Sequence, residues 1–576
     1  MAKVTRTQET VTSIRLSYDL LSLPTAQHKA GLAGLLLQIR SIAARPRDFD
    51  GRVVPKIVDM TSTTATIELS EDSTQTLFDD LYCARIGEAR SSSRWAGETR
   101  PKRIDEEKVS DPQTERTKTQ KWFVYDVVKP NSPVLRQHLR DRKGDGPWMK
   151  LWREMLWAIP RAQPKAREAY NKVAQQQPCP EVAKVWKELV AFQKEATKNR
   201  LRTTTVSGAV FLGAQAVNAE AIPFAERSDY LLLLHFWALT VQVFVPQRIE
   251  NDGSTDFVGY SMAIPDVADL ERFLDEYPAM LGELTAELRG YRPAQAVVDL
   301  PSQGALEFMR HMAEVVQHRT HDVRNRVSDA VTGFEYMHLH KVGNNVKCLA
   351  SGRMAPNAAL LEDYLAIIDA KPQPYRNPLF RLGLLTALLN NSSWFGGFAK
   401  MLLERPWTLF LRCSETPRTM PFFANDVAAK FRNVRSRYHA NLEDPEDMSD
   451  TPLETADEPL ELLIYQLVRT YIVRKTEERS GLKWNDFKDN TLPSDSGKPR
   501  VDVPKEYREA KERIAQDLFL ALRSRREVDF VDYFAARICS VGQFLTEAKY
   551  QTVARALLDK PEEVKTLALL AVSANS

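Results

Sequence analysis

The spacing of apolar residues predicts a mixed first part of the chain and a helical second part. Residues 13–20 alternate between apolar and polar side chains, as a half-buried strand does, and 53–58 and 64–69 repeat this pattern as a pair. Pro24 and Thr25 precede apolar residues at helical spacing and indicate a helix start. Further strands are predicted over 122–128, 203–212, 231–245 and 257–264. Further helices are predicted near Pro133 and Pro147 and over 267–288 and 304–327.

A β-hairpin is predicted near the end of this mixed part. Residues 332–340 and 346–351 both alternate, and Gly343, Asn344 and Asn345 lie between them. Glycine and asparagine tolerate the positive φ angles that a tight turn requires. The pattern therefore indicates two antiparallel strands joined by a short turn.

After about residue 375 the alternating patterns stop. Leu460, Leu463, Ile464 and Leu467 repeat at helical spacing, and Gly481 supplies a C-terminal cap. Similar patterns run over 504–526, 528–541, 545–557 and 561–571. We expect an α+β fold in which a mixed N-terminal domain of antiparallel strands and helices, over 1–400, precedes an all-α helical bundle over 401–576.

The segment 91–120 is rich in charge and poor in large apolar residues. It contains Pro101, Pro112 and three consecutive serines, so it cannot bury enough surface to offset the entropy of ordering. We therefore expect a mobile charged loop, and its composition is more typical of a solvated insertion than of a functional loop. The loop carries Arg94, Trp95, Arg100, Lys102 and Arg103.

Composition allows several functions. With 576 residues, 43% of them hydrophobic, the chain is long enough for more than one core. The 79 lysines and arginines are nearly balanced by 76 acidic residues, so the net charge of +3 does not by itself indicate a nucleic-acid partner. Any basic surface must be local.

The five cysteines are scattered and form no C-x-x-C pair, which argues against a disulfide framework and a zinc ribbon. Residues 1–12 are polar and lack the apolar core of a secretory signal, and the apolar run 230–245 is short for a membrane span. These features predict a cytoplasmic protein in which that run is buried core.

The sequence contains no Walker loop, no G-x-S-x-G elbow and no G-x-G-x-x-G turn, so NTP-driven and acyl-transfer chemistry lack support. His318, His321 and Asp322 fit a metal-dependent phosphohydrolase of the His-Asp type. His338 and His340 would complete a composite site, but histidines at a helix end serve more often as caps or surface residues. We expect no catalysis, metal or cofactor, and keep the phosphohydrolase as the alternative.

One run is the most informative in the chain. Residues 23–35 read LPTAQHKAGLAGL, in which Gly31 and Gly34 omit side chains where another backbone is expected to approach. Residues 236–246, 257–266, 343–347 and 351–353 read FWALTVQVFVP, FVGYSMAIPD, GNNVK and SGR. In this order, over about residues 15–400, these runs resemble the large subunit of Cascade, the CRISPR surveillance complex, in the type I-B branch first recognised in myxobacteria.

The resemblance implies a non-catalytic subunit of an RNA-guided complex. Its N-terminal domain would inspect the short duplex motif that flanks the target and help to open the duplex. Its C-terminal bundle, which resembles the Cascade small subunit, would stabilise the R-loop. The implied partners are CRISPR RNA, target double-stranded DNA and its displaced strand, the backbone and repeat-handle-binding subunits, and a helicase-nuclease. A scaffold without DNA contacts of its own is a further alternative.

Two groups of residues are candidates for contacts to the flanking-motif duplex. The predicted hairpin combines ammonium groups that hold a phosphate with amides that read a base edge. Its candidates are Lys341, Asn344, Asn345 and Lys347. The second group faces outward from the first turn of the helix after Thr25 and comprises Gln27, His28 and Lys29. An ordinary exposed turn and a solvated helix start are the alternatives.

Trp394 and Phe395 lie between two predicted helices, beside Gly396 and Gly397. Aromatic side chains that are exposed next to flexible glycines can stack on separated bases, so we expect this pair to help separate strands. Packing at a domain junction is the alternative.

Basic residues recur along the predicted bundle helices, and a groove lined by them would hold a single strand by its phosphates. The helix macrodipole alone also favours basic residues near helix C-termini. The candidates are Lys430, Arg432, Arg435, Arg437, Arg469, Arg474, Lys475, Arg523, Arg525 and Arg526. Met420 and Met448 precede bundle helices, and either could open a separate small subunit translated from an internal start.

Overall fold

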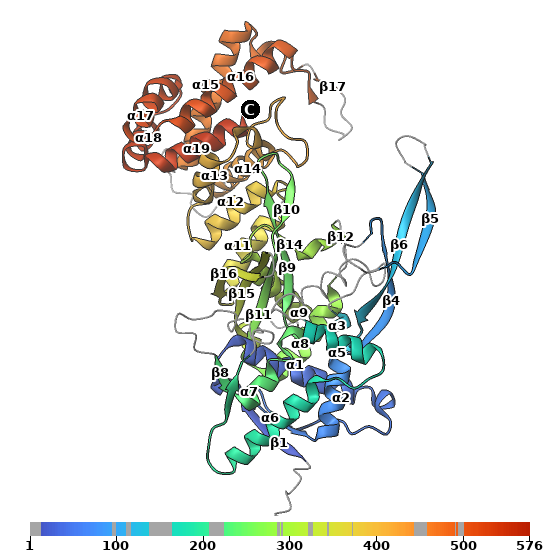
Figure 1. Ribbon diagram of the computed structural model, residues 1–576. Coiled ribbons are helices and arrows are strands. Elements are labelled where there is room, and N and C mark those ends of the chain that lie inside the picture. The colour runs from blue at the N-terminus through green and yellow to red at the C-terminus, as the bar shows by residue number, and fades with distance from the viewer. Residues whose placement is uncertain are drawn as a thin grey trace, which may run out of the picture. The chain divides into compact units, whose positions relative to one another are not determined.

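The structure is a computed structural model that divides into two compact units, coloured along the chain in Figure 1. It describes residues 13–94, 100–110, 117–137, 164–206, 224–284, 288–289, 292–320, 327–342, 345–370, 373–442, 458–489, 491–492 and 500–576. Unit 1 comprises Met1–Pro246 and Val258–Asn357, and unit 2 comprises Gln247–Phe257 and Ala358–Ser576. The division therefore falls at residue 357 rather than near residue 400.

A small antiparallel sheet begins unit 1. β1 (Ile14–Asp19), β2 (Lys56–Met60) and β3 (Thr64–Leu69) pair in the order β1-β3-β2, which confirms the predicted strands and the predicted pairing of the second with the third. α1 (Ala26–Ala43) follows with Thr25 as its N-cap residue, and most of its side chains are buried. α2 (Glu71–Leu81) begins with a capping box.

Two glycines of α1 allow another backbone to approach. A methyl group added at Gly31 would lie 2.3 Å from the carbonyl oxygen of Leu233, and one added at Gly34 would lie 2.2 Å from that of Phe236. No side chain can occupy either position without moving one of the two segments. The predicted close approach at both glycines is confirmed.

Residues 231–245 do not form the predicted strand. α7 (Ser228–Leu233) and a 3-10 turn (Trp237–Leu239) precede β9 (Gln242–Ile249). A continuous apolar run has no periodicity that separates a strand from a buried helix, and this explains the wrong prediction. The run does form buried core, since Leu233 and Phe236 are fully enclosed.

β9 leads into a larger antiparallel sheet. β11 (Tyr260–Val267) pairs with β9 and with β15 (Val331–Val342), which pairs with β16 (Asn345–Met354). The predicted hairpin is thus confirmed, and its residues 343–344 lie outside the described part of the chain. The end of β9 enters unit 2, where it pairs with β10 (Thr255–Phe257).

Helices of unit 1 pack on this sheet and on one another. α1 and α9 (Gln303–Thr320) contact the sheet, and α8 (Leu270–Glu283) contacts both helices. The predicted helix near Pro147 lies outside the described residues. The remaining elements are α3 (Pro133–Gln137), α5 (Pro164–Ala174), α6 (Glu181–Ala196), α10 (Val327–Ala330), β7 (Thr203–Thr205), β8 (Ala225–Arg227), β12 (Leu288–Arg289), β13 (Arg292–Pro293) and β14 (Val297–Val298).

The segment expected as a mobile loop contributes to a charged three-stranded sheet. β4 (Ala84–Ser91), β6 (Thr117–Pro130) and β5 (Arg103–Ser110) pair antiparallel in that order. The loop prediction over 91–120 is therefore wrong for the strand residues described within it. Trp95 lies outside the described residues.

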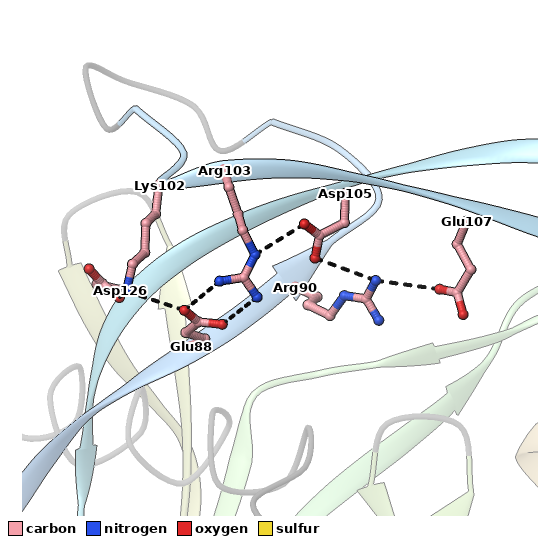
Figure 2. A network of polar contacts seen from close by, with 7 residues as sticks. All are labelled: Glu88, Arg90, Lys102, Arg103, Asp105, Glu107 and Asp126. Carbon is pink, nitrogen blue, oxygen red and sulfur yellow. Dashed lines mark hydrogen bonds and ion pairs between the residues drawn. The ribbon is translucent and has the colours of Figure 1, made fainter.

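Linked ion pairs cross the strands of this sheet, as Figure 2 shows. Arg103 donates two hydrogen bonds to Glu88, at 2.8 and 2.7 Å, and a third to Asp105 at 3.0 Å. Lys102 bridges Glu88 and Asp126 at 3.2 and 3.0 Å. Backbone pairing and the buried side chains of Val124, Tyr125 and Val127 on β6 stabilise the sheet, and the exposed ion pairs add little to its stability. Lys102 and Arg103, which were expected on the mobile loop, are engaged in these ion pairs.

A buried helix lies at the centre of unit 2. α19 (Pro561–Ala574) contacts α14 (Phe423–Leu442), α15 (Leu460–Ser480) and α16 (Lys505–Ser524), and its side chains from Val564 to Ser573 are all buried. Gly481 ends α15 with a φ angle of 71°, as its predicted capping role requires. The helical bundle is therefore confirmed.

The bundle core extends back to α12 (Pro378–Leu389). The rings of Phe380, Phe398 and Phe410 lie around Phe423, at centroid distances of 5.5, 6.0 and 5.1 Å. This cluster explains why unit 2 begins well before residue 401. The remaining elements are α11 (Ala358–Ile368), α13 (Ala399–Glu404), α17 (Glu527–Tyr533), α18 (Glu547–Asp559), β17 (Thr491–Leu492) and β18 (Arg500–Val501). None of the helices described here is long and apolar enough to cross a bilayer.

Four buried histidines in unit 1 favour the neutral state. Burial lowers the pKa of His28 and of His235 to about 4, and that of His311 to about 3. Burial also lowers the pKa of His338. Arg310 donates a hydrogen bond to Nε2 of His311 at 2.8 Å, which only an unprotonated nitrogen can accept.

Replacing Gly34 with alanine should destabilise unit 1. The added methyl group collides with backbone at Phe236, so we expect a loss of about 3 kcal/mol despite the better helix propensity of alanine. Urea unfolding measures the change. Gly87→Ala is the matched control, because its methyl group meets only the flexible side chain of Lys129, and equal stability of the two variants would contradict the prediction.

Acid should destabilise unit 1 through its buried histidines. Their pKa values in the folded state lie below the unfolded value near 6.5. The contribution of the neutral histidines to the free energy of unfolding is therefore complete above pH 6.5 and is lost as the pH falls towards about 4. The loss at pH 5.5 amounts to about 1 kcal/mol for each histidine. In urea titrations from pH 7 to 5, His311→Leu should show a flatter pH dependence than the unchanged chain. An unaltered slope would count against the prediction.

Candidate nucleic-acid interface

Unit 2 contains a large basic groove lined mainly by α14, α15 and α16. Its volume of about 1570 Å³ exceeds that of a typical small-molecule pocket, roughly 300–1,000 Å³, and suits an extended ligand. Along α15, Gln466, Arg469, Val473 and Glu477 recur at helical spacing and line it. Leu463 and Leu467 belong to the hydrophobic core of the unit.

Seven cations and two carboxylates line the basic groove. The cations are Arg412, Arg432, Arg435, Arg469, Arg474, Arg508 and Lys511. The carboxylates belong to Glu477 and Glu512, and Glu477 accepts a hydrogen bond from the backbone N–H of Trp484 at 2.9 Å. The excess positive charge makes the groove a candidate site for a polyanion.

The pKa of Lys511 is lowered mainly by burial and further by neighbouring cations of the groove. Burial lowers the pKa of its ammonium group below the ordinary value, and the neighbouring Arg412 and Arg469 lower it further, while Glu512 opposes them. A phosphate bound beside Lys511 would reverse this effect, because it stabilises the charged form.

Aromatic side chains share the groove with these cations. The rings of Phe431 and Tyr465 lie 4.6 Å apart between centroids, and those of Trp484 and Tyr507 lie 6.1 Å apart. Phe544 also lines the groove and is 47% exposed. Phe431 and Tyr507 are each only 2% exposed, so Tyr465, Trp484 and Phe544 are the rings that can stack bases of a single strand while the cations hold its phosphates.

The structure brings together four of the predicted bundle residues: Arg432, Arg435, Arg469 and Arg474. Sequence reasoning missed Arg412, Arg508 and Lys511. The predicted residues were mainly basic residues near helix C-termini. Arg508 and Lys511 instead lie in the first two turns of α16, where the macrodipole does not favour a cation. Their position against the dipole is the signal that could have identified them.

The other predicted bundle residues do not line this groove. Lys430 is largely buried above the Trp394 ring, 5.5 Å from its centroid, and burial lowers its pKa to about 8. Lys475 pairs with Glu478 at 2.5 Å. Arg437 is exposed elsewhere on α14, and Arg523, Arg525 and Arg526 lie at and beyond the last turn of α16.

The expected role of Trp394 and Phe395 in strand separation is wrong. Phe395 is 6% exposed and belongs to the core of unit 2, and the Trp394 ring packs edge-on against Phe398 and Phe431. Residues held in this way cannot insert between bases. Aromatic side chains beside glycines suggested exposure, but Gly397 is needed because the backbone of Gly383 approaches it within 2.0 Å of an added methyl group.

Gln27 and His28 are buried rather than exposed, contrary to expectation. Each is 1% exposed, and Thr25 shares a hydrogen bond of 2.8 Å with Nδ1 of His28. Lys29 forms an ion pair of 2.8 Å with Asp266, which Arg353 also contacts at 2.6 Å. Burial opposes ionisation of Asp266, yet these contacts hold its pKa below the ordinary value. The first turn of α1 is therefore part of the core of unit 1.

The hairpin β15–β16 is formed, and Lys347 is exposed on it, opposite His340. Lys341 and Asn345 lie at register positions next to the turn, opposite Val346 and Val342. Asn344 lies outside the described residues. The hairpin thus presents a cation near its tip, as a contact to DNA would require.

The histidine pattern gains no support as a metal site. His321 and Asp322 lie outside the described residues, and His318 lies in α9. His338 uses Nε2 in a hydrogen bond of 2.6 Å to the carbonyl oxygen of Val258. Across the described part of the chain, no three histidine, cysteine or acidic residues come together as metal ligands.

Models of known protein families match almost the whole chain. A family model described as the type I-B CRISPR Cas8b N-terminal domain matches residues 54–322. A second, described as the type I-B CRISPR Cas8b C-terminal domain, matches residues 331–575 and so includes both the hairpin and the basic groove. No curated protein sequence matches the chain.

Proposed function

Since this chain belongs to the type I-B CRISPR Cas8b family of Cascade large subunits, we propose that it recognises duplex DNA through unit 1 and holds opened DNA in unit 2. It does so as a non-catalytic partner of CRISPR RNA and of the other subunits of the complex. The flanking motif is read first, the duplex is opened, and a helicase-nuclease is recruited to the resulting R-loop.

The basic groove carries this proposal. Arg432, Arg435, Arg469 and Arg508 have no carboxylate within 4.0 Å of their charged groups among the residues described, so they are available to phosphates. Release of counterions from the bound strand would supply most of the affinity without reading its sequence. The aromatic lining favours a single strand over a duplex, because bases paired in a duplex cannot stack on the protein.

Recognition of the flanking duplex is assigned to the hairpin β15–β16. A two-stranded ribbon fits a groove of DNA, and its lysines and asparagines can contact phosphates and base edges. The ion pair between Arg353 of β16 and Asp266 of β11 holds the base of the ribbon to the sheet. Lys29 of α1 contacts the same carboxylate, so its role here is positional.

A separate small subunit is compatible with unit 2 if translation begins at Met420. That methionine precedes α14, so the product would retain α14 to α19. Met448 follows α14 and lies outside the described residues, and a start there would remove Phe423, Val427 and Phe431 from the core. We therefore assign the internal start, where one is used, to Met420.

Neutral variants of groove residues should weaken the grip on the opened strand. In the assembled complex, Arg469→Gln combined with Arg508→Gln should shorten R-loop lifetime and reduce the salt dependence of binding by about two in log–log slope, one for each lost phosphate contact. Stopped-flow dissociation at several salt concentrations measures both. Arg513→Gln is the matched control, because this residue is exposed on the same helix outside the groove.

Lys347→Gln in the same assay should slow the first encounter with duplex and leave the lifetime of a formed R-loop unchanged. The two variants thus separate the roles of the two units. Unchanged salt slopes in the groove variant would instead favour a scaffold that makes no DNA contact of its own.

The internal start gives a further prediction. Met420→Leu should abolish any short product in the purified complex, whereas Met448→Leu should leave it in place, because a start at Met420 retains α14 with its core residues Phe423, Val427 and Phe431, which a start at Met448 lacks. Intact-mass spectrometry distinguishes the products. Finding only the full-length chain before any substitution would reject the internal start.

A further inference from the structure

A second cationic pocket in unit 2 lies at the other end of α16 from the basic groove. It is lined by Leu403, Leu520, Arg523, Ser524, Arg526 and Lys565. It shares no residue with the groove, and the rise of α16 between Arg508 and Arg523 separates the two sites by about 22 Å. The pocket therefore needs an explanation of its own.

The backbone holds two of its three cations in place. Lys565 is 3% exposed and donates a hydrogen bond from Nζ to the carbonyl oxygen of Arg525 at 2.6 Å. Arg523 donates one from its guanidinium group to the carbonyl oxygen of Leu403. An ammonium carries three donors and a guanidinium five, so both retain donors for a ligand.

Among the described residues, no carboxylate lies within 4.0 Å of the charged groups of Arg523, Arg526 or Lys565. Two of the acidic residues nearby in the sequence pair with other cations, Asp529 with Arg525 at 3.2 Å and Glu563 with Lys560 at 3.4 Å. Cations that are partly removed from water without an anion are unfavourable, so a bound carboxylate or phosphate would stabilise the pocket.

The apolar residues that line the pocket favour the carboxylate of a peptide over the phosphate of a nucleic acid. Leu403 and Leu520 line it and are 36% and 39% exposed, and no aromatic side chain does so. A nucleic-acid strand would find nothing here on which to stack its bases, in contrast to the basic groove. A peptide can place a carboxylate on the cations and an aliphatic side chain on the leucines.

We propose that this pocket docks an acidic segment of a partner protein in which a glutamate or aspartate lies beside an aliphatic residue. Exposed Arg526 attracts the segment, Arg523 and Lys565 hold its carboxylate, and the two leucines bind its apolar side chain. The volume of about 360 Å³ admits a few side chains. The site is independent of the function assigned to the groove.

Fluorescence anisotropy on the full chain tests the proposal. The probes are a labelled peptide of glutamates that contains two leucines, the same peptide with serine in place of leucine, and a labelled oligothymidylate. Arg526→Glu should weaken binding of the leucine peptide at least tenfold and leave oligothymidylate binding unchanged. Arg469→Glu in the groove should do the reverse. Arg513→Glu, exposed on α16 and in neither site, controls for the change in net charge.

The proposal is overturned if the leucine peptide does not bind, or if it binds equally well to the unchanged chain and to Arg526→Glu. It is also overturned if Arg513→Glu weakens peptide binding as much as Arg526→Glu does, which would indicate an effect of bulk charge. If Arg526→Glu weakens oligothymidylate binding as much as Arg469→Glu does, the pocket belongs to the nucleic-acid path instead. Equal binding of the serine peptide would overturn the role proposed for the leucines.

Discussion

The close crossing of α1 with residues 233–236 is the constraint on which unit 1 depends. Carbonyl groups fill the space that side chains at Gly31 and Gly34 would take, so α1 can be buried on nearly all sides. The helix places Lys29 beside Asp266, and Arg353 forms an ion pair with the same carboxylate. Four of the runs that resemble the Cascade large subunit thus meet in one packed region. Their pattern reports on packing rather than on a surface that touches DNA.

The regular spacing of apolar residues correctly predicted the elements that bury one face. The helices α15, α16 and α19 and the hairpin β15–β16 were predicted from spacing, and the two glycines from the absence of side chains. Polarity misled the interpretation of Gln27 and His28, because buried polar groups with local partners look like solvated ones in a sequence. Strands β4 and β5 were missed because their sequences are rich in charged residues and lack the alternation of apolar and polar side chains that predicts a strand.

Charge is distributed very differently in the two basic regions that the sequence suggested. In the sheet β4–β6–β5, Arg103 and Lys102 are matched by carboxylates across the strands, whereas the groove of unit 2 has cations in clear excess. A net charge of +3 for the whole chain conceals this contrast. The groove could be predicted only in part, because its residues come from separate helices whose relative placement no local pattern specifies.

The central position of α19 has a consequence for synthesis on the ribosome. This helix follows α14, α15 and α16 in the chain, yet it supplies the surface against which all three bury their apolar sides. Until it emerges from the exit tunnel, those helices remain incompletely covered and are open to association with other nascent chains. The bundle is therefore expected to complete its folding late and in one cooperative step.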